Sequence, residues 1–326
     1  MEFSELKNIS GYQGFSLVEL MVAMVISLFL SAGLFSMFSM SSTNVITTSQ
    51  FNQLQENGRI ALALIERDVS QVGFMADMTG SDFIIGSNTQ ILAPVVPNDC
   101  VGAGINNATL PNNTPSHFRR LWGYESGVSA DSIACLGAVN SGTDVLQIKR
   151  LVGPPTVAPT VTSRFYVAAT SSEAIFFSGG TIAPVLNNAR FWEYQHHIYY
   201  INDDGDIPVL RRRTLSVVNG MRNEEQLVEG IENIRILYGF DNDGDNTADS
   251  FMPVQNVTAL MWDNELFQRI VALRIFVLVR ATEPDNRYTN TTVYTLGDKT
   301  IAAANDNFRR KVVSTTIVLE NSVLIR

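Results

Sequence analysis

The chain begins with a long apolar segment. After Gly14, residues 15–40 read FSLVELMVAMVISLFLSAGLFSMFSM and carry a single charge, that of Glu19. An apolar run of more than about 20 residues is long enough to cross a bilayer as a helix. A carboxylate inside such a run costs on the order of 3 kcal/mol at the bilayer centre, so Glu19 is a candidate functional residue. We therefore expect a membrane helix that starts near Phe15.

The pattern then changes to that of an amphipathic helix. Residues 41–50, SSTNVITTSQ, are polar and contain mediocre helix formers. From residue 51 onward, apolar or small residues recur at spacings of three and four, and the opposite face carries polar and charged side chains. The recurring positions are Phe51, Leu54, Gly58, Ala61, Ile65, Val69 and Val72. The pattern predicts a helix, continuous with the first, that ends near Gly73 and lays one face on a sheet.

Beyond Gly73 the pattern is typical of short strands separated by turns. Alternating or β-branched runs predict strands at 83–87, 91–96, 144–152, 190–202, 207–215, 232–240, 268–281 and 311–320. The clearest hairpin joins HHIYYIN to IPVLRRRTL through residues 203–206. Residues 97–143 and 153–163 read as irregular connections. No strand–helix–strand alternation occurs, so the expected class is α+β, a long helix packed on an antiparallel sheet.

Composition and charge exclude few functions. The chain has 326 residues, enough for one or two domains, and 45 % of them are hydrophobic. Its formal net charge of −9 gives no electrostatic support to a general nucleic-acid role. There is no zinc spacing, phosphate-binding glycine loop or nucleophile motif, so we expect no enzyme. His196 and His197 are neighbours on a predicted strand and should point to opposite faces, and His117 stands alone.

The two cysteines, Cys100 and Cys135, lie in the irregular region. If the N-terminal segment delivers the rest of the chain across a membrane, the compartment is oxidising and the two residues are expected to form a disulfide. By the chain-entropy model, closing this loop would stabilise the fold by roughly 3 to 4 kcal/mol. The alternative is a pair of buried free thiols.

The N-terminal segment differs from a secretory signal peptide. Such a peptide has an apolar stretch of about 7 to 15 residues followed by a small-residue cleavage site. Here the apolar stretch is longer, and the small residue, Gly14, precedes it. Cleavage at Gly14 would leave the hydrophobic helix on the mature protein.

The motif Gly14-Phe15-Ser16-Leu17-Val18-Glu19-Leu20 resembles the class III signal of type IV pilins and type II secretion pseudopilins. The resemblance implies that prepilin peptidase cuts between Gly14 and Phe15 and methylates the new N-terminus at Phe15. It also implies that Glu19 neutralises the N-terminal amine of a neighbouring subunit during filament assembly. Pairing the two charges lowers the cost of holding each in lipid. The alternative role for Glu19 is stabilisation of its own helix N-terminus.

Further segments resemble the PilW-type minor pilins in particular. They follow that family's order and span most of the chain: QENGRIALALIERDVSQVGF at 55–74, LWGYES at 121–126, GTDVLQIKR at 142–150, LVEGIENIRILYGFDNDGD at 227–245 and FRRKVVSTTIVLEN at 308–321. The resemblance implies a type IV pilin-like fold with a leader at 1–14, a transmembrane and assembly helix at 15–72, and a β-rich domain at 73–326.

The resemblance also implies a function. A PilW-type minor pilin would enter the inner membrane as a single-pass prepilin with a periplasmic domain, and would later reach the pilus at the cell surface. It would help to prime pilus assembly and join a tip complex. The implied partners are other minor pilins, the major pilin, a PilY-type tip adhesin and prepilin peptidase. The alternatives are a J-type minor pseudopilin of type II secretion and a membrane-tethered module that binds calcium or a surface.

One acidic segment raises the question of a metal. DNDGDNTAD places Asp241, Asp243, Asp245 and Asp249 at close spacing around a glycine, as in a calcium loop. The glycine is at the fourth place and Met252 occupies the twelfth, which departs from the EF-hand pattern. An acidic turn after a strand explains the same residues. We expect no other cofactor, and calcium stays an open alternative. The run Arg211–Arg213 reads as a solvated strand end, and Trp122, Trp192 and Trp262 as core or interface residues.

Overall fold

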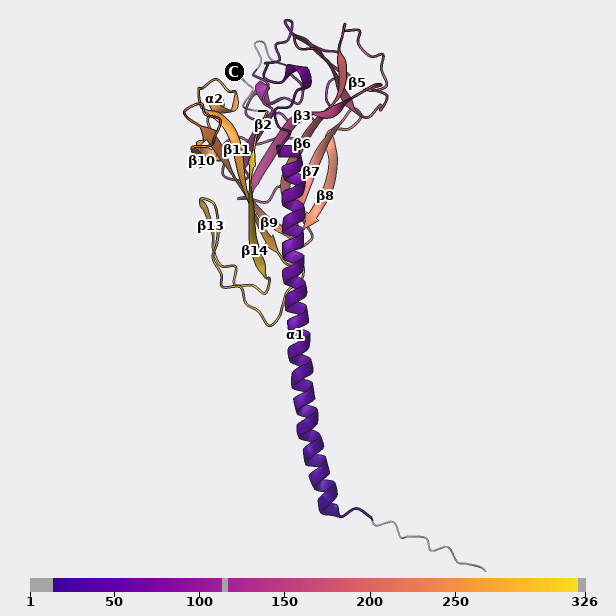
Figure 1. Cartoon of the computed structure of the whole chain (residues 1–326), viewed down its shortest axis with the longest axis vertical. Coiled ribbons are helices and arrows are strands. Elements are labelled where there is room, and N and C mark those ends of the chain that lie inside the picture. Colours follow the sequence, from indigo (N-terminus) through magenta and orange to yellow (C-terminus); the bar gives the residue numbers. More distant parts are fainter. Residues whose placement is uncertain (1–13, 113–116, 322–326) are drawn as a thin grey trace, which may run out of the picture. The chain divides into compact units, whose positions relative to one another are not determined.

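The computed structural model describes residues 14–112 and 117–321, and the chain forms two units, Met1–Phe51 and Asn52–Arg326. The helix α1, Leu17–Val69, runs through both units and has 53 residues (Figure 1). The polar residues 41–50 are helical, so the prediction of one continuous helix is confirmed. The helix begins two residues after Phe15.

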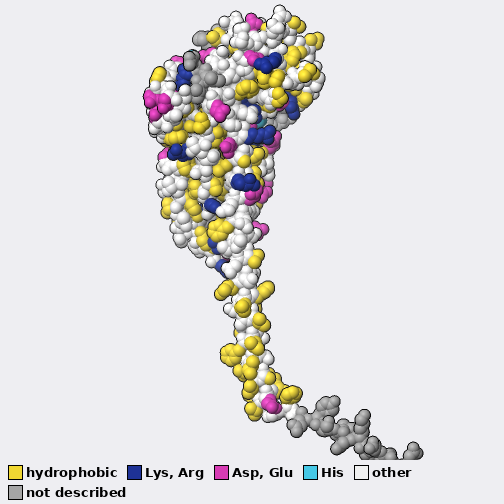
Figure 2. Space-filling model, viewed as in Figure 1, with side chains coloured by type: hydrophobic (Ala, Val, Ile, Leu, Met, Phe, Trp, Pro, Cys, Tyr) yellow, Lys and Arg dark blue, Asp and Glu magenta, His cyan; other side chains and the backbone are white. Residues whose placement is uncertain are grey.

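The first unit consists of the apolar part of α1. Its hydrophobic side chains are exposed within the unit, as Figure 2 shows. In the part of the chain that the structure describes, α1 is the one helix long and apolar enough to cross a membrane, with a mean hydropathy of 2.3 over its best window. The composition and the exposure together fit a segment whose surroundings are lipid or other helices.

The second unit begins with the amphipathic part of α1. This part buries Leu54, Gly58, Ala61, Ile65 and Val69 against the sheets. All five positions belong to the predicted apolar face. The helix ends before Gly73, whose φ of 80° is a left-handed conformation that suits glycine at a helix C-terminus.

Two main sheets build the domain around α1. The larger has eight strands in the order β1-β5-β4-β6-β3-β2, with β7 beside β6 and β8 beside β7. Its strands are β1 Thr89–Ile91, β2 Leu121–Glu125, β3 Asp144–Thr156, β4 Phe165–Ala169, β5 Ala174–Ser178, β6 Arg190–Asp204, β7 Ile207–Ser216 and β8 Gly220–Glu229.

The smaller sheet has the order β10-β9-β11-β14, and a separate hairpin pairs β12 with β13. The bounds are β9 Ile231–Asp241, β10 Ser250–Pro253, β11 Arg269–Arg280, β12 Tyr294–Leu296, β13 Lys299–Ile301 and β14 Arg310–Val318. Short helical turns lie at η1 Ala76–Met78, η2 Ile105–Asn107, η3 Val254–Asn256 and α2 Ala259–Trp262.

Most predicted strands are present. The five between residues 190 and 320 and the strand at 144–152 are found within a few residues of their expected bounds. The hairpin at 203–206 is confirmed, with Asp204 opposite Ile207. The predicted strand at 83–87 is wrong, because only an isolated bridge at Ile85 forms there. The region at 91–96 is a strand only as far as Ile91.

The sheets are antiparallel except at one pair. β1 runs parallel to β5, with Thr89 opposite Ala174. Strands β2, β4 and β5 are buried at every position, so they show no alternation that a sequence pattern could reveal. Strand β2 lies inside the region 97–143 that the pattern presents as irregular, and β4 and β5 lie between residues 164 and 189, where no strand was predicted. The fold is the expected α+β class with a pilin-like arrangement of one long helix and a β-rich domain.

Candidate functional site

The N-terminus of α1 carries the residues of the expected processing and assembly site. The backbone N–H of Ser16 donates to Glu19 Oε2 at 2.9 Å, and the N–H of Val18 donates to Ser16 Oγ at 3.3 Å. This is a capping box, in which a serine and a glutamate three residues apart satisfy free N–H groups at a helix start. Within a single chain, Glu19 therefore stabilises its own helix. This contact agrees with the alternative role expected of Glu19, and the sequence Ser-x-x-Glu at 16–19 is the local signal for the cap.

Gly14 and Phe15 precede the helix and belong to no regular secondary structure. Phe15 is 88 % exposed, and no atom lies within 4 Å of the Cβ position of Gly14. Among the described residues, none beyond the chain neighbours of Gly14 crowds the expected cleavage bond. Residues 1–13, the rest of the expected leader, lie outside the described residues. Cleavage at Gly14, methylation at Phe15 and pairing by Glu19 stay predictions.

A buried ionic cluster joins α1 to the larger sheet. Asp68, near the end of α1, is only 2 % exposed. It accepts hydrogen bonds from Arg150 at 2.8 Å, from Tyr199, and from His197 Nδ1 at 2.5 Å. Burial raises the pKa of Asp68, but the hydrogen bonds from His197 and Tyr199 and the charge of Arg150 outweigh it and hold the pKa well below its usual range. The cluster ties the last turns of α1 to strands β3 and β6.

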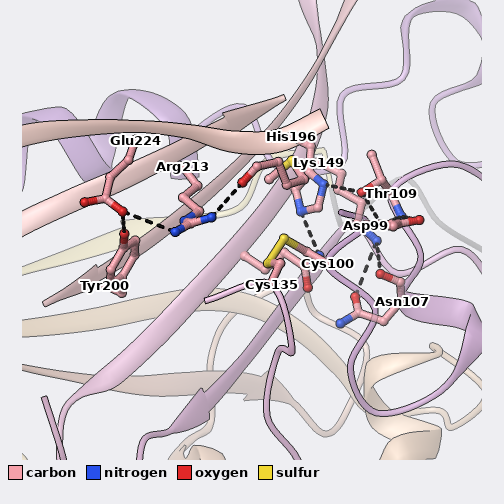
Figure 3. The surroundings of a disulfide bond; sticks show 12 residues. Asp99, Cys100, Asn107, Thr109, Cys135, Lys149, His196, Tyr200, Arg213 and Glu224 are labelled. Carbon is pink, nitrogen blue, oxygen red and sulfur yellow. Dashed lines mark hydrogen bonds and ion pairs between the residues drawn. A yellow bond between two sulfur atoms is a disulfide. The ribbon is translucent and has the colours of Figure 1, made fainter. Parts of the chain in front are cut away.

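Cys100 and Cys135 form the predicted disulfide, with their Cα atoms 4.9 Å apart (Figure 3). Both are buried beside the main core. The bridge ties the long connection after β1 to the segment between β2 and β3. It thus holds two irregular stretches that have little hydrogen-bonded sheet of their own.

Beside the disulfide, two buried basic residues anchor the same connection. Lys149 is fully buried and donates to the carbonyl oxygens of Asn107 at 3.0 Å and Ala108 at 2.7 Å. Burial lowers the pKa of Lys149 well below its ordinary value. His196, also fully buried, lies 3.0 Å from Thr109 Oγ1 (Figure 3).

The hydrogen bonds around His196 form a short chain. The Thr109 hydroxyl lies 2.5 Å from Asp99 Oδ1, and Gln147 Nε2 lies 2.7 Å from His196 Nε2. In the neutral tautomer in which Nε2 accepts from the Gln147 amide, the proton is on Nδ1 and is donated to Thr109 Oγ1. Burial lowers the pKa of His196, which agrees with the neutral form. These contacts are structural, and His197 points to the opposite face as predicted.

The acidic loop follows β9. Oxygens of Asp241, Asp243 and Asp249 lie within 4.8 Å of one another, a spacing that could hold a cation. The carboxylate of Asp241, however, already accepts from the backbone N–H groups of Asp243 at 3.1 Å, Gly244 at 2.6 Å and Asn246 at 2.9 Å. Asp245 accepts from Thr247 and lies outside the group of three. The hydrogen bonds favour the turn, and the calcium alternative stays a prediction.

The interpretation of Arg211–Arg213 as a solvated strand end is wrong. Arg211 is 9 % exposed, and its guanidinium pairs with Glu224 at 2.5 Å. Arg212 pairs with Glu225 at 2.7 Å across the β7–β8 ladder. The strand β8 supplies the acids, and the sequence pattern did not predict that strand. The three tryptophans are buried, as expected for core residues: Trp122, Trp192 and Trp262.

The chain has a long apolar helix whose start is capped by Glu19, and a β-rich domain with a disulfide follows it. This arrangement is that of the type IV pilin-like class of proteins. Two family models match the chain. The prokaryotic N-terminal methylation motif matches residues 9–35, and the type IV pilus-assembly protein W matches residues 198–321. The matches confirm the resemblance to a PilW-type minor pilin of the type IV pilus. No curated protein and no solved structure gives a significant match.

The matches and the structure support a coarse function. The matches support a type IV pilus-related pilin, and the PilW family is a structural component of the pilus. Its methylation motif and long apolar helix indicate a membrane-anchored prepilin. A protein of this class works through contacts with the membrane and with other pilus components.

Proposed function

We propose that this chain is a minor pilin that primes pilus assembly and takes its place in the tip complex. It enters the inner membrane as a prepilin with the β-rich domain in the periplasm. Prepilin peptidase cuts between Gly14 and Phe15 and methylates Phe15. The observation that supports this most is the glycine placed before an exposed apolar helix, together with a methylation-motif match at 9–35.

Glu19 carries the assembly step. In a single chain its carboxylate accepts one hydrogen bond, from Ser16, and stays exposed within the unit. After cleavage, each subunit gains an N-terminal amine at Phe15. A carboxylate and an amine from two neighbouring subunits lower one another's cost in lipid when they pair. The pairing would place each new subunit in register with the one before it.

The β-rich domain supplies the contacts that distinguish a minor pilin from the bulk of the filament. We propose that its partners are the other minor pilins, the major pilin and a PilY-type tip adhesin, as in the PilW family that residues 198–321 match. The protein then reaches the cell surface with the pilus. The anchored domain has no proposed catalytic role.

The role of Glu19 can be tested with two variants that separate charge from capping. Glu19→Val removes both, whereas Glu19→Gln keeps a group that can cap Ser16 and removes the charge. We expect both variants to reduce incorporation into sheared pili, and the number of pili per cell, by at least about tenfold, since one unpaired buried charge costs several kcal/mol. Ser16→Ala, which weakens the cap alone, should be incorporated normally. Normal incorporation of Glu19→Gln would assign Glu19 to capping.

Deletion of the gene for this chain distinguishes a role in the pilus from a role in type II secretion. The match to a pilus-assembly family favours loss of surface pili and twitching. Loss of exoprotein secretion with intact pili would instead identify a J-type pseudopilin.

A further inference from the structure

The smaller sheet has a free edge at strand β14, where backbone hydrogen-bonding groups are left unpaired. Strand β14 is the last in the order β10-β9-β11-β14 and pairs only with β11 among the described residues. The pairing runs without a bulge from Ala272 opposite Val318 to Arg280 opposite Arg310. A long, regular edge strand presents a row of free backbone donors and acceptors.

The residues with outward-facing backbone groups follow from the hydrogen bonds at the two ends of the ladder. Leu319 N–H donates to Val271 O at 2.8 Å, and Ala281 N–H donates to Arg309 O at 2.8 Å. Antiparallel ladders alternate between hydrogen-bonded and non-hydrogen-bonded pairs. The bonds at both ends therefore agree that the backbone groups of the odd-numbered residues of β14 point toward β11. The N–H and C=O groups that point away from β11 belong to Arg310, Val312, Ser314, Thr316 and Val318. None of these backbone groups bonds another residue in the described parts of the chain.

The edges at β8 and β10 are protected, and this one is not. β8 carries Arg222, Glu224 and Glu225, and charges on an edge oppose further pairing. β10 has four residues and ends at Pro253. In contrast, β14 has no charged residue from Val312 to Val318, and the sequence VVSTTIV is rich in β-branched residues. An edge of this kind would promote aggregation if it stayed uncovered.

The surroundings of the edge favour a neutral strand with an apolar side. The amphipathic part of α1 lies over β14, because the Cβ position of Gly58 is 2.8 Å from Val313 Cγ2. Leu62, one turn further along α1, and Val313 are both only partly buried. At the start of the strand, Lys311 forms no ion pair with any residue the structure describes. An added strand would cover Leu62 and Val313, and an acidic residue at its end would pair with Lys311.

We propose that β14 is the docking site for an extended strand of a different pilus subunit, which adds to the sheet through main-chain hydrogen bonds. This inference rests on the proposed function. A second copy of this chain is a poorer occupant, because two β14 edges pair most simply about a two-fold axis. The amphipathic helices of the two copies would then run in opposite directions, with the Asn52 of each at opposite ends of the pair. Subunits anchored in one membrane need their helices to run the same way.

The test removes one outward N–H. In Ser314→Pro the lost donor faces away from β11, so the fold should hold, whereas Thr315→Pro loses a donor to β11. In the full-length mature protein in detergent, we expect Ser314→Pro to lower Tm by less than about 4 °C and Thr315→Pro to lower it more. In cells, Ser314→Pro should reduce the chain's amount in sheared pili at least about tenfold relative to its membrane pool. Ser314→Ala, which keeps the N–H, should match the wild type.

Two results would overturn the proposal: normal incorporation of Ser314→Pro, or an equal loss with Ser314→Ala. A disulfide-linked homodimer of Ser314→Cys in the membrane would identify a second copy as the occupant and contradict it too. These outcomes leave the proposed function standing if the wild type is present in pili. Absence of the wild-type chain from pili would contradict the proposed function and this proposal together.

Discussion

At the residue scale, two carboxylates near opposite ends of α1, those of Glu19 and Asp68, differ in their contacts. Glu19 caps the start of the helix in a position where a partner's amine can replace the Ser16 N–H. Asp68 is buried near the other end and is already fully paired. The first carboxylate is available to another subunit, and the second is committed to its own domain. The exposed carboxylate of Glu19 is the one that we propose for assembly, and the buried carboxylate of Asp68 is structural.

The Asp68 cluster predicts a loss of stability in acid. The pKa of Asp68 lies below its ordinary value of 3.8 in the folded state, so its contribution is fully present above about pH 4 and is lost as pH falls further. Asp68→Asn should cost about 3 kcal/mol at pH 7, since it leaves Arg150 buried without its carboxylate. The difference in unfolding free energy between variant and wild type should narrow below about pH 4, as measured by urea unfolding.

The matched control is Asp77→Asn. Asp77 pairs with Arg190 at the surface, where the arginine side chain is 54 % exposed. A surface pair of this kind contributes about 0 to 1 kcal/mol, so the control should change stability little at any pH. Equal effects of the two substitutions would show that the buried cluster does not hold α1.

At the element scale, α1 packs on the smaller sheet through a glycine. Gly58 leaves room for Val313 of β14 and Val279 of β11, whose Cγ2 atoms lie 2.8 Å and 3.1 Å from the Cβ position. Glycine is unfavourable inside a helix by about 1 kcal/mol relative to alanine, so close packing is the reason it is found here. The helix therefore sits against the edge strand β14 and against its neighbour β11.

Gly58→Leu should force α1 away from β14. We expect a loss of about 2 to 3 kcal/mol, because the larger side chain would overpack against Val313 and Val279. Ala63→Leu on the exposed face of the same helix turn should stay within about 0.5 kcal/mol. Thermal unfolding of the two variants and the wild type measures these differences in stability. A neutral Gly58→Leu would mean that the helix is not seated as closely as described.

The acidic loop is also an element with a clear expected behaviour. Because three backbone N–H groups already occupy Asp241, we expect millimolar calcium to leave Tm unchanged and Asp241→Asn to lower it, as the turn loses acceptors. Asp243→Ala should have a small effect in either buffer. A rise in Tm with calcium that disappears in Asp243→Ala would instead establish a calcium site.

At the scale of the whole molecule, the sequence pattern predicts what depends on local periodicity. The apolar run, the amphipathic face from Leu54 to Val69 and the long alternating strands after residue 190 follow from spacing alone. Strands such as β4 and β5 could not be found in this way, because both faces of each are buried. The parallel pair β1–β5 joins segments far apart in the chain, so a local sequence pattern cannot predict that they pair.

The candidate site shows the same division. Gly14, Phe15 and Glu19 belong to one local motif, so their roles could be proposed from the sequence and stay predictions. The pairing of the two cysteines was predicted and is confirmed. The cluster around Asp68 was not, because its members come from α1, β3 and β6 and meet only in the folded domain. The partners of Arg211 and Arg212 depend on β8, whose mixed polar pattern does not read as a strand. The local motif at residues 14–20 is the basis for the proposed processing site. Which charged side chains are paired depends on tertiary contacts, which the sequence pattern does not show.

The central claim is that the chain is a processed pilin, and the N-terminus of the mature protein tests it most directly. Mass spectrometry of the protein isolated from the membrane and from sheared pili should give an N-terminal peptide that begins at Phe15 and carries a methylated amine. Gly14→Arg should block the cut and leave the leader in place. A wild-type chain that keeps its leader, with Met1 intact and no methylated Phe15, would contradict the account and favour a membrane-tethered protein that never enters a filament.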